Sequence, residues 1–229
     1  MQRKFLNARS PLRLLEKNLH GGLGRGNLGI VLAGHGVGKT SFLVGVAVDE
    51  LLRRGRVLHV SAAHSVAHVR THYETLFDEL ASSTRLENEG LIRSEIERNR
   101  SIRVYPPNSI TAARLRDAVK LERESGGAPS LLVLEGVDLG AFGRADCEDL
   151  RALAQELDAE VWLESACKDE RVVRIPPQVA AVEDLLSVIL ALEPDDHGVR
   201  LRALKDHENR DLANLHVALD PRTLLLKRS

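Results

Sequence analysis

This sequence is poor in aromatic residues and carries almost no net charge. Phenylalanine, tryptophan and tyrosine make up 3% of its 229 residues, so it offers few platforms for stacking single-stranded bases. The formal net charge is −1 at pH 7, which gives no overall attraction to nucleic acid or to an anionic membrane. We therefore expect no membrane partner, and charge gives no support to a nucleic-acid partner.

Cysteine and long hydrophobic runs are also scarce. The two cysteines, Cys147 and Cys167, lack the paired spacing of a zinc site and cannot build a disulfide framework. This usage is typical of a reducing, cytoplasmic setting. No stretch approaches the length of a membrane span, and the basic N-terminus is not followed by an apolar signal core. We expect a soluble, cytoplasmic protein whose 229 residues form a single domain.

A glycine-rich loop at residues 33–41 is the most informative segment. It fits the looser form of the phosphate-binding loop, with Ala33 where the stricter pattern has glycine. Glycines allow successive backbone N–H groups to curl around a phosphate. The Lys39 ammonium is placed to contact the outer phosphates, and the Thr40 hydroxyl to ligate Mg²⁺. A strand-type run precedes the loop, and a helix-type pattern follows it, so a positive helix end also faces the anion. The pattern predicts ATP and Mg²⁺ as ligands, with the nucleotide held by Gly34, His35, Gly36, Val37, Gly38, Lys39, Thr40 and Ser41.

Strand-like and helix-like segments alternate along most of the chain. This alternation predicts an α/β fold, in which helices cover both faces of a mainly parallel sheet. After Pro176 and Pro177 the helical patterns stop. The strand candidates that follow predict an antiparallel tail over 178–229, which extends one edge of the sheet. The expected strands are 28–32, 56–61, 101–105, 130–134, 160–163, 185–192, 198–204, 215–219 and 223–226, and the expected helices are 11–19, 38–54, 65–80, 83–98, 110–124 and 145–158.

Three further segments extend the pattern around the loop. Residues 14–27, Leu-Leu-Glu-Lys-Asn-Leu-His-Gly-Gly-Leu-Gly-Arg-Gly-Asn, read as a leucine-bearing helix with a glycine-rich lead into the first strand. The strand at 54–61 and a lysine-bearing hairpin at 204–210 follow in order. Together with the loop they resemble the RecA superfamily of ATPases, closest to its KaiC-like and DnaB-like members. The resemblance covers nearly the whole chain. It implies one RecA-like nucleotide-binding domain over 1–229, with 1–27 as its N-terminal helix and lead-in.

The resemblance also implies an acid that holds Mg²⁺ through water at the end of a second conserved strand. Glu135 ends the strand at 131–134. It is one methylene longer than the usual aspartate but can still reach the metal shell. Asp138, three residues later, is an alternative. The alternative interpretation is that Glu135 only ends a strand at the polar edge of the sheet, where acidic residues are common.

The glutamate that orients the attacking water in such ATPases has no counterpart here. Ala63 stands in its expected position, within the segment Ala-Ala-His-Ser at 62–65. Alanine can neither accept a proton nor position a water, and groups that do so change phosphoryl-transfer rates by orders of magnitude. His64 is a weaker candidate for the catalytic role, and its simpler interpretation is a residue at a helix start. Hydrolysis is therefore expected to be slow or absent.

Ring-forming and filament-forming members of the superfamily insert a lysine and an arginine from the tail hairpin into a neighbour's nucleotide site. Lys205 matches the lysine, but His207 stands where the arginine is expected. Arg210 is then the candidate for the second cation of this trans-acting finger. A cation at a hairpin tip is as readily a solvated side chain. The resemblance thus implies self-assembly or a protein partner.

Three histidines follow one another at helical spacing. His64, His68 and His72 are four residues apart, so they project from one face of the expected helix and could share a Zn²⁺ ion. No cysteine or acid at matching spacing completes a site. A polar surface stripe is the simpler interpretation in a chain with 9 histidines.

Three functions use a loop of this kind: a nucleotide-dependent switch, a motor or remodelling ATPase, and a small-molecule kinase. Such kinases carry an arginine-rich lid, which an antiparallel tail does not suit. Ala63, the neutral charge and the scarcity of aromatics favour a switch, whereas the hairpin favours assembly. We expect a RecA/KaiC-like ATP-binding protein with slow or absent hydrolysis that acts as a nucleotide-dependent switch or assembly factor. The alternative is an active oligomeric motor or remodelling ATPase that acts on nucleic acid or protein.

Overall fold

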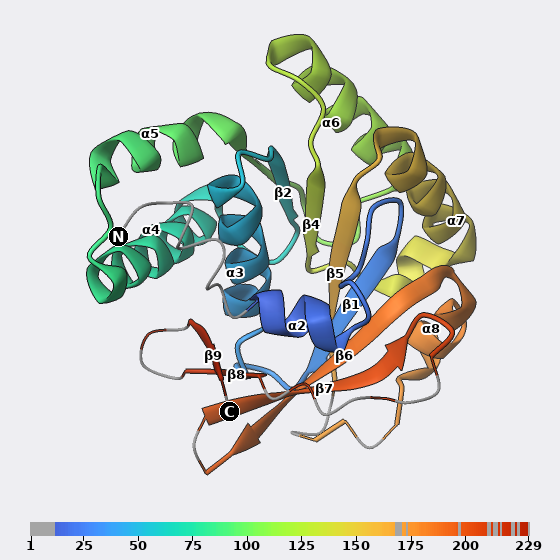
Figure 1. Ribbon diagram of the computed structural model, residues 1–229. Helices are drawn as coiled ribbons and strands as arrows, with labels where there is room; N and C mark the ends of the chain where they lie inside the picture. Colours follow the sequence, from blue (N-terminus) through green and yellow to red (C-terminus); the bar gives the residue numbers. More distant parts are fainter. Residues whose placement is uncertain are drawn as a thin grey trace.

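The computed structural model describes residues 12–167, 171–172, 174–196, 198–209, 212, 215, 217–220, 223 and 225–228. A nine-stranded sheet forms its centre (Figure 1), in the order β3-β2-β4-β5-β1-β6-β7-β8-β9. The strands are β1 Leu28–Ala33, β2 Val57–Ser61, β3 Arg100–Val104, β4 Leu131–Glu135, β5 Glu160–Ala166, β6 Leu186–Asp195, β7 Gly198–Asp206, β8 Val217–Leu219 and β9 Leu226–Arg228. The helices are α2 Leu12–Asn18, α3 Lys39–Leu52, α4 Val66–Thr84, α5 Glu89–Asn99, α6 Ala112–Ser125, α7 Leu139–Leu157 and α8 Pro177–Ala180, with a 3₁₀ turn, η1, at Glu183–Leu185.

The first six strands of the chain run parallel and the last three run antiparallel. β1 pairs in parallel with β5 on one side and with β6 on the other, and β2 pairs in parallel with β3 and β4. β7, β8 and β9 then add antiparallel strands at one edge. The expected antiparallel tail is therefore correct for these three strands but wrong for β6. The connection from β5 to β6 contains α8 and η1, and a crossover of this length lets β6 return in the direction of β1.

Helices cover both faces of the sheet, as the alternating pattern predicts (Figure 1). One apolar core lies under α2, α3, α4 and α5, and it includes Phe42, Val69 and Ile92. The other lies under α6 and α7 and includes Leu115 and Leu150. The central strands β1 and β4 are buried along their whole length, because helices cover both faces of the sheet there.

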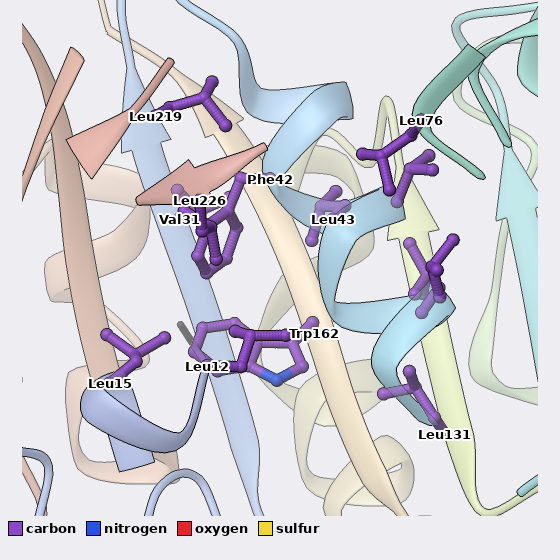
Figure 2. Packing of buried hydrophobic residues seen from close by; sticks show 14 of the residues in the cluster. Leu12, Leu15, Val31, Phe42, Leu43, Leu76, Leu131, Trp162, Leu219 and Leu226 are labelled. Atoms are coloured by element: carbon purple, nitrogen blue, oxygen red, sulfur yellow. The ribbon is translucent and has the colours of Figure 1, made fainter. Parts of the chain in front are cut away.

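Aromatic packing fixes α3 against the sheet beside the glycine loop. Figure 2 shows Phe42 of α3 facing Trp162 of β5, with Leu219 and Leu226 from β8 and β9 in the same cluster. The ring centroids of Phe42 and Trp162 are 5.6 Å apart at an interplanar angle of 78°, the edge-to-face arrangement that aromatic pairs favour. A Cβ atom at Gly29 would lie 2.9 Å from the Trp162 ring. The indole therefore needs glycine at this position of β1.

A glycine and a proline account for two differences between the observed helices and those expected from the sequence. Gly143, with φ 72° and ψ 174°, interrupts α7, so the expected helix at 145–158 corresponds to the part after this kink. The short α8 begins after Pro176, in a region where only strands were expected. Among the described residues, no helix has the length and apolar character needed to cross a membrane. Residues 1–11 of the expected lead-in lie outside the described part of the chain.

Candidate functional site

The glycine loop connects β1 to α3 at the carboxyl edge of the parallel strands. Gly36 and Gly38 have φ values of 76° and 106°, a region that residues with a side chain rarely adopt. A Cβ atom at Gly38 would also lie 2.6 Å from Leu219 of β8. Glycine at this position therefore serves both the turn and the packing of the tail against the loop. α3 begins at Lys39, with Gly38 as its N-cap.

Lys39 points along the loop and is mostly buried. Its Nζ donates to the carbonyl oxygen of Gly34 at 3.2 Å and lies 3.9 Å from Oε2 of Glu164. The side chains of Lys39 and Glu164 are only 12% and 11% exposed, so solvent screens this ion pair less than a surface pair. The ammonium is thus held at the loop by the Gly34 carbonyl and by Glu164.

Glu164 is the functional candidate that the sequence reasoning missed. It lies on β5, which separates β1 from β4 in the sheet, and it stands opposite Val31 of β1. Its Oε1 accepts a hydrogen bond from the backbone N–H of Gly136 at 3.0 Å. Burial raises the pKa of this carboxyl, and the positive charge of Lys39 opposes that rise. A carboxylate therefore sits beside the loop lysine, on the side of β4 away from Ala63.

Glu135 is fully buried at the end of β4. Its Oε2 lies 3.2 Å from Nε2 of His59 on β2. Burial alone would raise the pKa of Glu135, but the hydrogen bond and charge of His59, with a smaller contribution from the Thr40 hydroxyl, lower it to about 2. The carboxylate is thus ionised at neutral pH, next to the hydroxyl that follows the loop lysine.

A buried relay links this carboxylate to α4. Nδ1 of His59 lies 3.1 Å from the hydroxyl of Tyr73, and burial raises the pKa of Tyr73 well above its usual range. The Nε2–H of His59 donates to Glu135, and the other ring nitrogen shares a hydrogen bond with the Tyr73 hydroxyl, which can act as donor or acceptor. The relay orients one oxygen of Glu135 and leaves the other for a different partner.

The donor set fits a magnesium ion held through water. Within the described part of the chain, Oε1 of Glu135 is buried and has no hydrogen-bond partner. The Thr40 hydroxyl lies beside the Glu135 carboxyl group, and hydroxyl and carboxylate oxygens are the hard ligands that Mg²⁺ uses. Asp138, the alternative acid, instead caps α7 by accepting from the N–H of Gly140 at 2.9 Å. The geometry therefore favours Glu135 over Asp138.

Ala63 and His64 follow β2 at the same edge. A Cβ atom at Gly136 would lie 2.7 Å from the nitrogen of Ala63, so the two loops after β2 and β4 touch. The N–H groups of Ala63 and His64 both face the Ser61 hydroxyl, at 3.2 and 3.0 Å. The His64 ring stacks on His68 of α4, with centroids 4.3 Å apart. The His64 side chain thus stacks on the start of α4, and it also contributes to the lowered pKa of Glu135.

Lys205 and Arg210 are the two candidates for the trans-acting finger, and the structure describes Lys205 but not Arg210. Lys205 lies within β7, not at a hairpin tip, and its Nζ donates to the carbonyl oxygen of Glu183 in the same chain at 2.7 Å. The turn comes after it, where His207 has a φ of 53° and Asn209 bridges to Asp206. Arg210 lies outside the described residues. Among the candidates, the structure brings together the loop, Lys39, Thr40 and Glu135, and it leaves Lys205 in a separate contact with η1.

No protein-family model matches this sequence, and the search of curated proteins finds no match either.

Proposed function

We propose that this chain is a RecA-like protein that binds ATP with Mg²⁺ through the loop at 34–41. The observation that carries the proposal is the convergence of Lys39, Thr40 and Glu135 at one edge of a parallel sheet. Ligands of such sheets bind at the carboxyl ends of the strands. The N-terminus of α3 adds backbone N–H groups and a positive helix end for an anion.

Each residue has a defined part in this proposal. Lys39 leaves Glu164 and the Gly34 carbonyl to contact the outer phosphates, and the backbone of the loop surrounds them. The Thr40 hydroxyl and Oε1 of Glu135 hold Mg²⁺, which would neutralise part of the phosphate charge. His59 keeps the other oxygen of Glu135 in place through its hydrogen bond.

Turnover in this proposal is slow or absent, and the protein acts as a nucleotide-dependent switch or assembly factor. The edge beside Glu135 holds Ala63 where a water-orienting carboxylate would be needed, and a methyl group cannot take a proton. The contact between the loops after β2 and β4, at Ala63 and Gly136, offers a route by which bound nucleotide alters the surface around α4.

A second candidate function, an active oligomeric ATPase motor or remodelling enzyme, is favoured by one observation. Glu164 supplies a buried carboxylate 3.9 Å from Lys39, and its raised pKa is the kind of shift found at catalytic acids and bases. In that case Glu164 would orient the attacking water from the opposite side of β4.

Phosphate release measured beside nucleotide binding separates the two functions. The purified chain is mixed with saturating MgATP, and phosphate release is followed under conditions where binding is established by calorimetry. The switch requires binding with turnover well below about 1 s⁻¹, against a typical enzyme value of about 10 s⁻¹. Turnover near that typical value would reject the switch and favour the motor.

A further inference from the structure

The histidine row on α4 forms a close pair whose nitrogens converge. Nε2 of His72 lies 3.2 Å from Nε2 of His68, and the ring centroids are 4.8 Å apart at an angle of 66°. The two residues are one helical turn apart, so their Cβ atoms lie on the same face of α4. The spacing predicted this shared face, and the structure adds the convergence of the two ring nitrogens.

The distance between these nitrogens matches a bidentate metal chelate. Zn²⁺ binds histidine nitrogen at about 2.0–2.1 Å and prefers tetrahedral angles. Two nitrogens 3.2 Å apart that share one ion at that bond length subtend an angle of about 100–105° at the ion. A tetrahedral site needs about 109°, so the separation of the two nitrogens suits a shared tetrahedral ion.

A metal ion binds an imidazole through a nitrogen lone pair, so it would take the place of the proton that the two rings share. The nearest acid on the helix, Glu74, is already paired with Arg70 at 2.7 Å. Glu74 is therefore already engaged by a neighbouring side chain, and the two nitrogens are the protein donors that the pair offers.

We propose that His68 and His72 form a two-histidine chelate for a tetrahedral divalent transition-metal ion such as Zn²⁺. Among the described residues, no group of three or more histidine, cysteine or acidic side chains is arranged to hold a metal. The chelate therefore uses two protein ligands, and water or a donor from outside the chain completes the coordination. His64 stacks on His68 and lies outside the chelate.

The proposal does not depend on nucleotide binding. It is tested on the nucleotide-free protein, because ATP itself binds Zn²⁺. The full chain without a histidine tag is titrated with Zn²⁺ in a non-coordinating buffer by calorimetry. We expect saturable binding of one ion per chain. Co²⁺, used as a second probe, should give the visible absorption of a tetrahedral nitrogen site.

Variants on the same helix decide the assignment. Replacement of either ligand, in His68→Gln or His72→Gln, should weaken Zn²⁺ binding on the order of tenfold or more, and the double variant should abolish it. The matched control Thr75→Gln changes an exposed residue of α4 and should bind as wild type does. Circular dichroism checks that each variant keeps its helix.

Two results would overturn the proposal. Wild-type protein that takes up no Zn²⁺ in a saturable manner, or a double variant that binds it unchanged, would leave the short nitrogen–nitrogen distance as an ordinary hydrogen bond between imidazoles. A loss in His64→Ala as large as in His68→Gln would overturn the assignment to the pair.

Discussion

Glu164→Gln is the substitution that most directly tests how Lys39 is held at the glycine loop. Glutamine keeps the shape of the side chain and an oxygen that can accept from the N–H of Gly136. It removes only the negative charge beside Lys39. The ion pair indicates that Glu164 competes with a phosphate for the Lys39 ammonium. The variant should therefore bind MgATP more tightly than wild type.

The size of this effect follows from the pair's geometry. Two unit charges 3.9 Å apart attract by about 4 kcal/mol at an effective dielectric constant of about 20. Desolvation of both groups offsets most of this attraction, which leaves a net term on the order of 1–2 kcal/mol. Binding should therefore tighten by about 5- to 30-fold.

Calorimetric titration of wild type and Glu164→Gln with MgATP, at several pH values, measures the effect. Because burial raises the pKa of Glu164, wild-type Glu164 takes up a proton as the pH falls and loses its hold on Lys39. The affinity ratio between variant and wild type should shrink toward one on acidification. Protonation of the nucleotide acts equally on both proteins, so it cancels in the ratio.

Equal affinities of the two proteins at every pH, or weaker binding by the variant, would show that Glu164 does not compete with the nucleotide for Lys39. Weaker binding would mean that the carboxylate supports the nucleotide instead of competing with it. Slower phosphate release at unchanged affinity would instead place Glu164 in the reaction, as the second candidate function requires.

Three further outcomes are expected. The pKa of Glu135 is lowered to about 2 from an ordinary 4.5. This shift stabilises the fold by on the order of 3 kcal/mol at neutral pH. The contribution is present above pH 4.5 and is lost as the pH falls toward 2. Urea unfolding of wild type and Glu135→Gln should give a gap in unfolding free energy that closes over this window, and a constant gap would contradict it. Ala63→Glu should raise phosphate release, and an unchanged rate would show that position 63 does not face the phosphates. ATP with Mg²⁺ should promote assembly in light scattering, and Lys205→Ala with Arg210→Ala should weaken it; a chain that stays monomeric at saturating ATP would rule assembly out.

Most of the fold could be predicted from local pattern. Strands buried under helices on both faces read as continuous apolar runs, and the loop at 34–38 carries its own glycine signature. β6 was predicted with the wrong direction, because strand direction depends on the crossover and not on composition. The short α8 has too few residues to show helical periodicity.

The site could be predicted only where residues are close in sequence. Lys39 and Thr40 belong to one motif, and Glu135 ends a recognisable strand. Glu164 could not be found in this way, since it is one of two glutamates in β5 and has no distinguishing spacing. Only the sheet order, which inserts β5 between β1 and β4, brings it to Lys39. The signal that the sequence does carry is a charged residue directly after the buried residues Val161, Trp162 and Leu163.

Calorimetric titration of wild type and Lys39→Ala with MgATP tests whether the loop at 34–41 binds the nucleotide. Lys39 supplies the charge for the outer phosphates, and loss of such a contact costs about 1.5–3 kcal/mol, or about ten- to a hundredfold in affinity. We expect wild type to bind MgATP and Lys39→Ala to lose this binding, with an unchanged circular dichroism spectrum. Undiminished binding in the variant, or no binding by wild type, would contradict it.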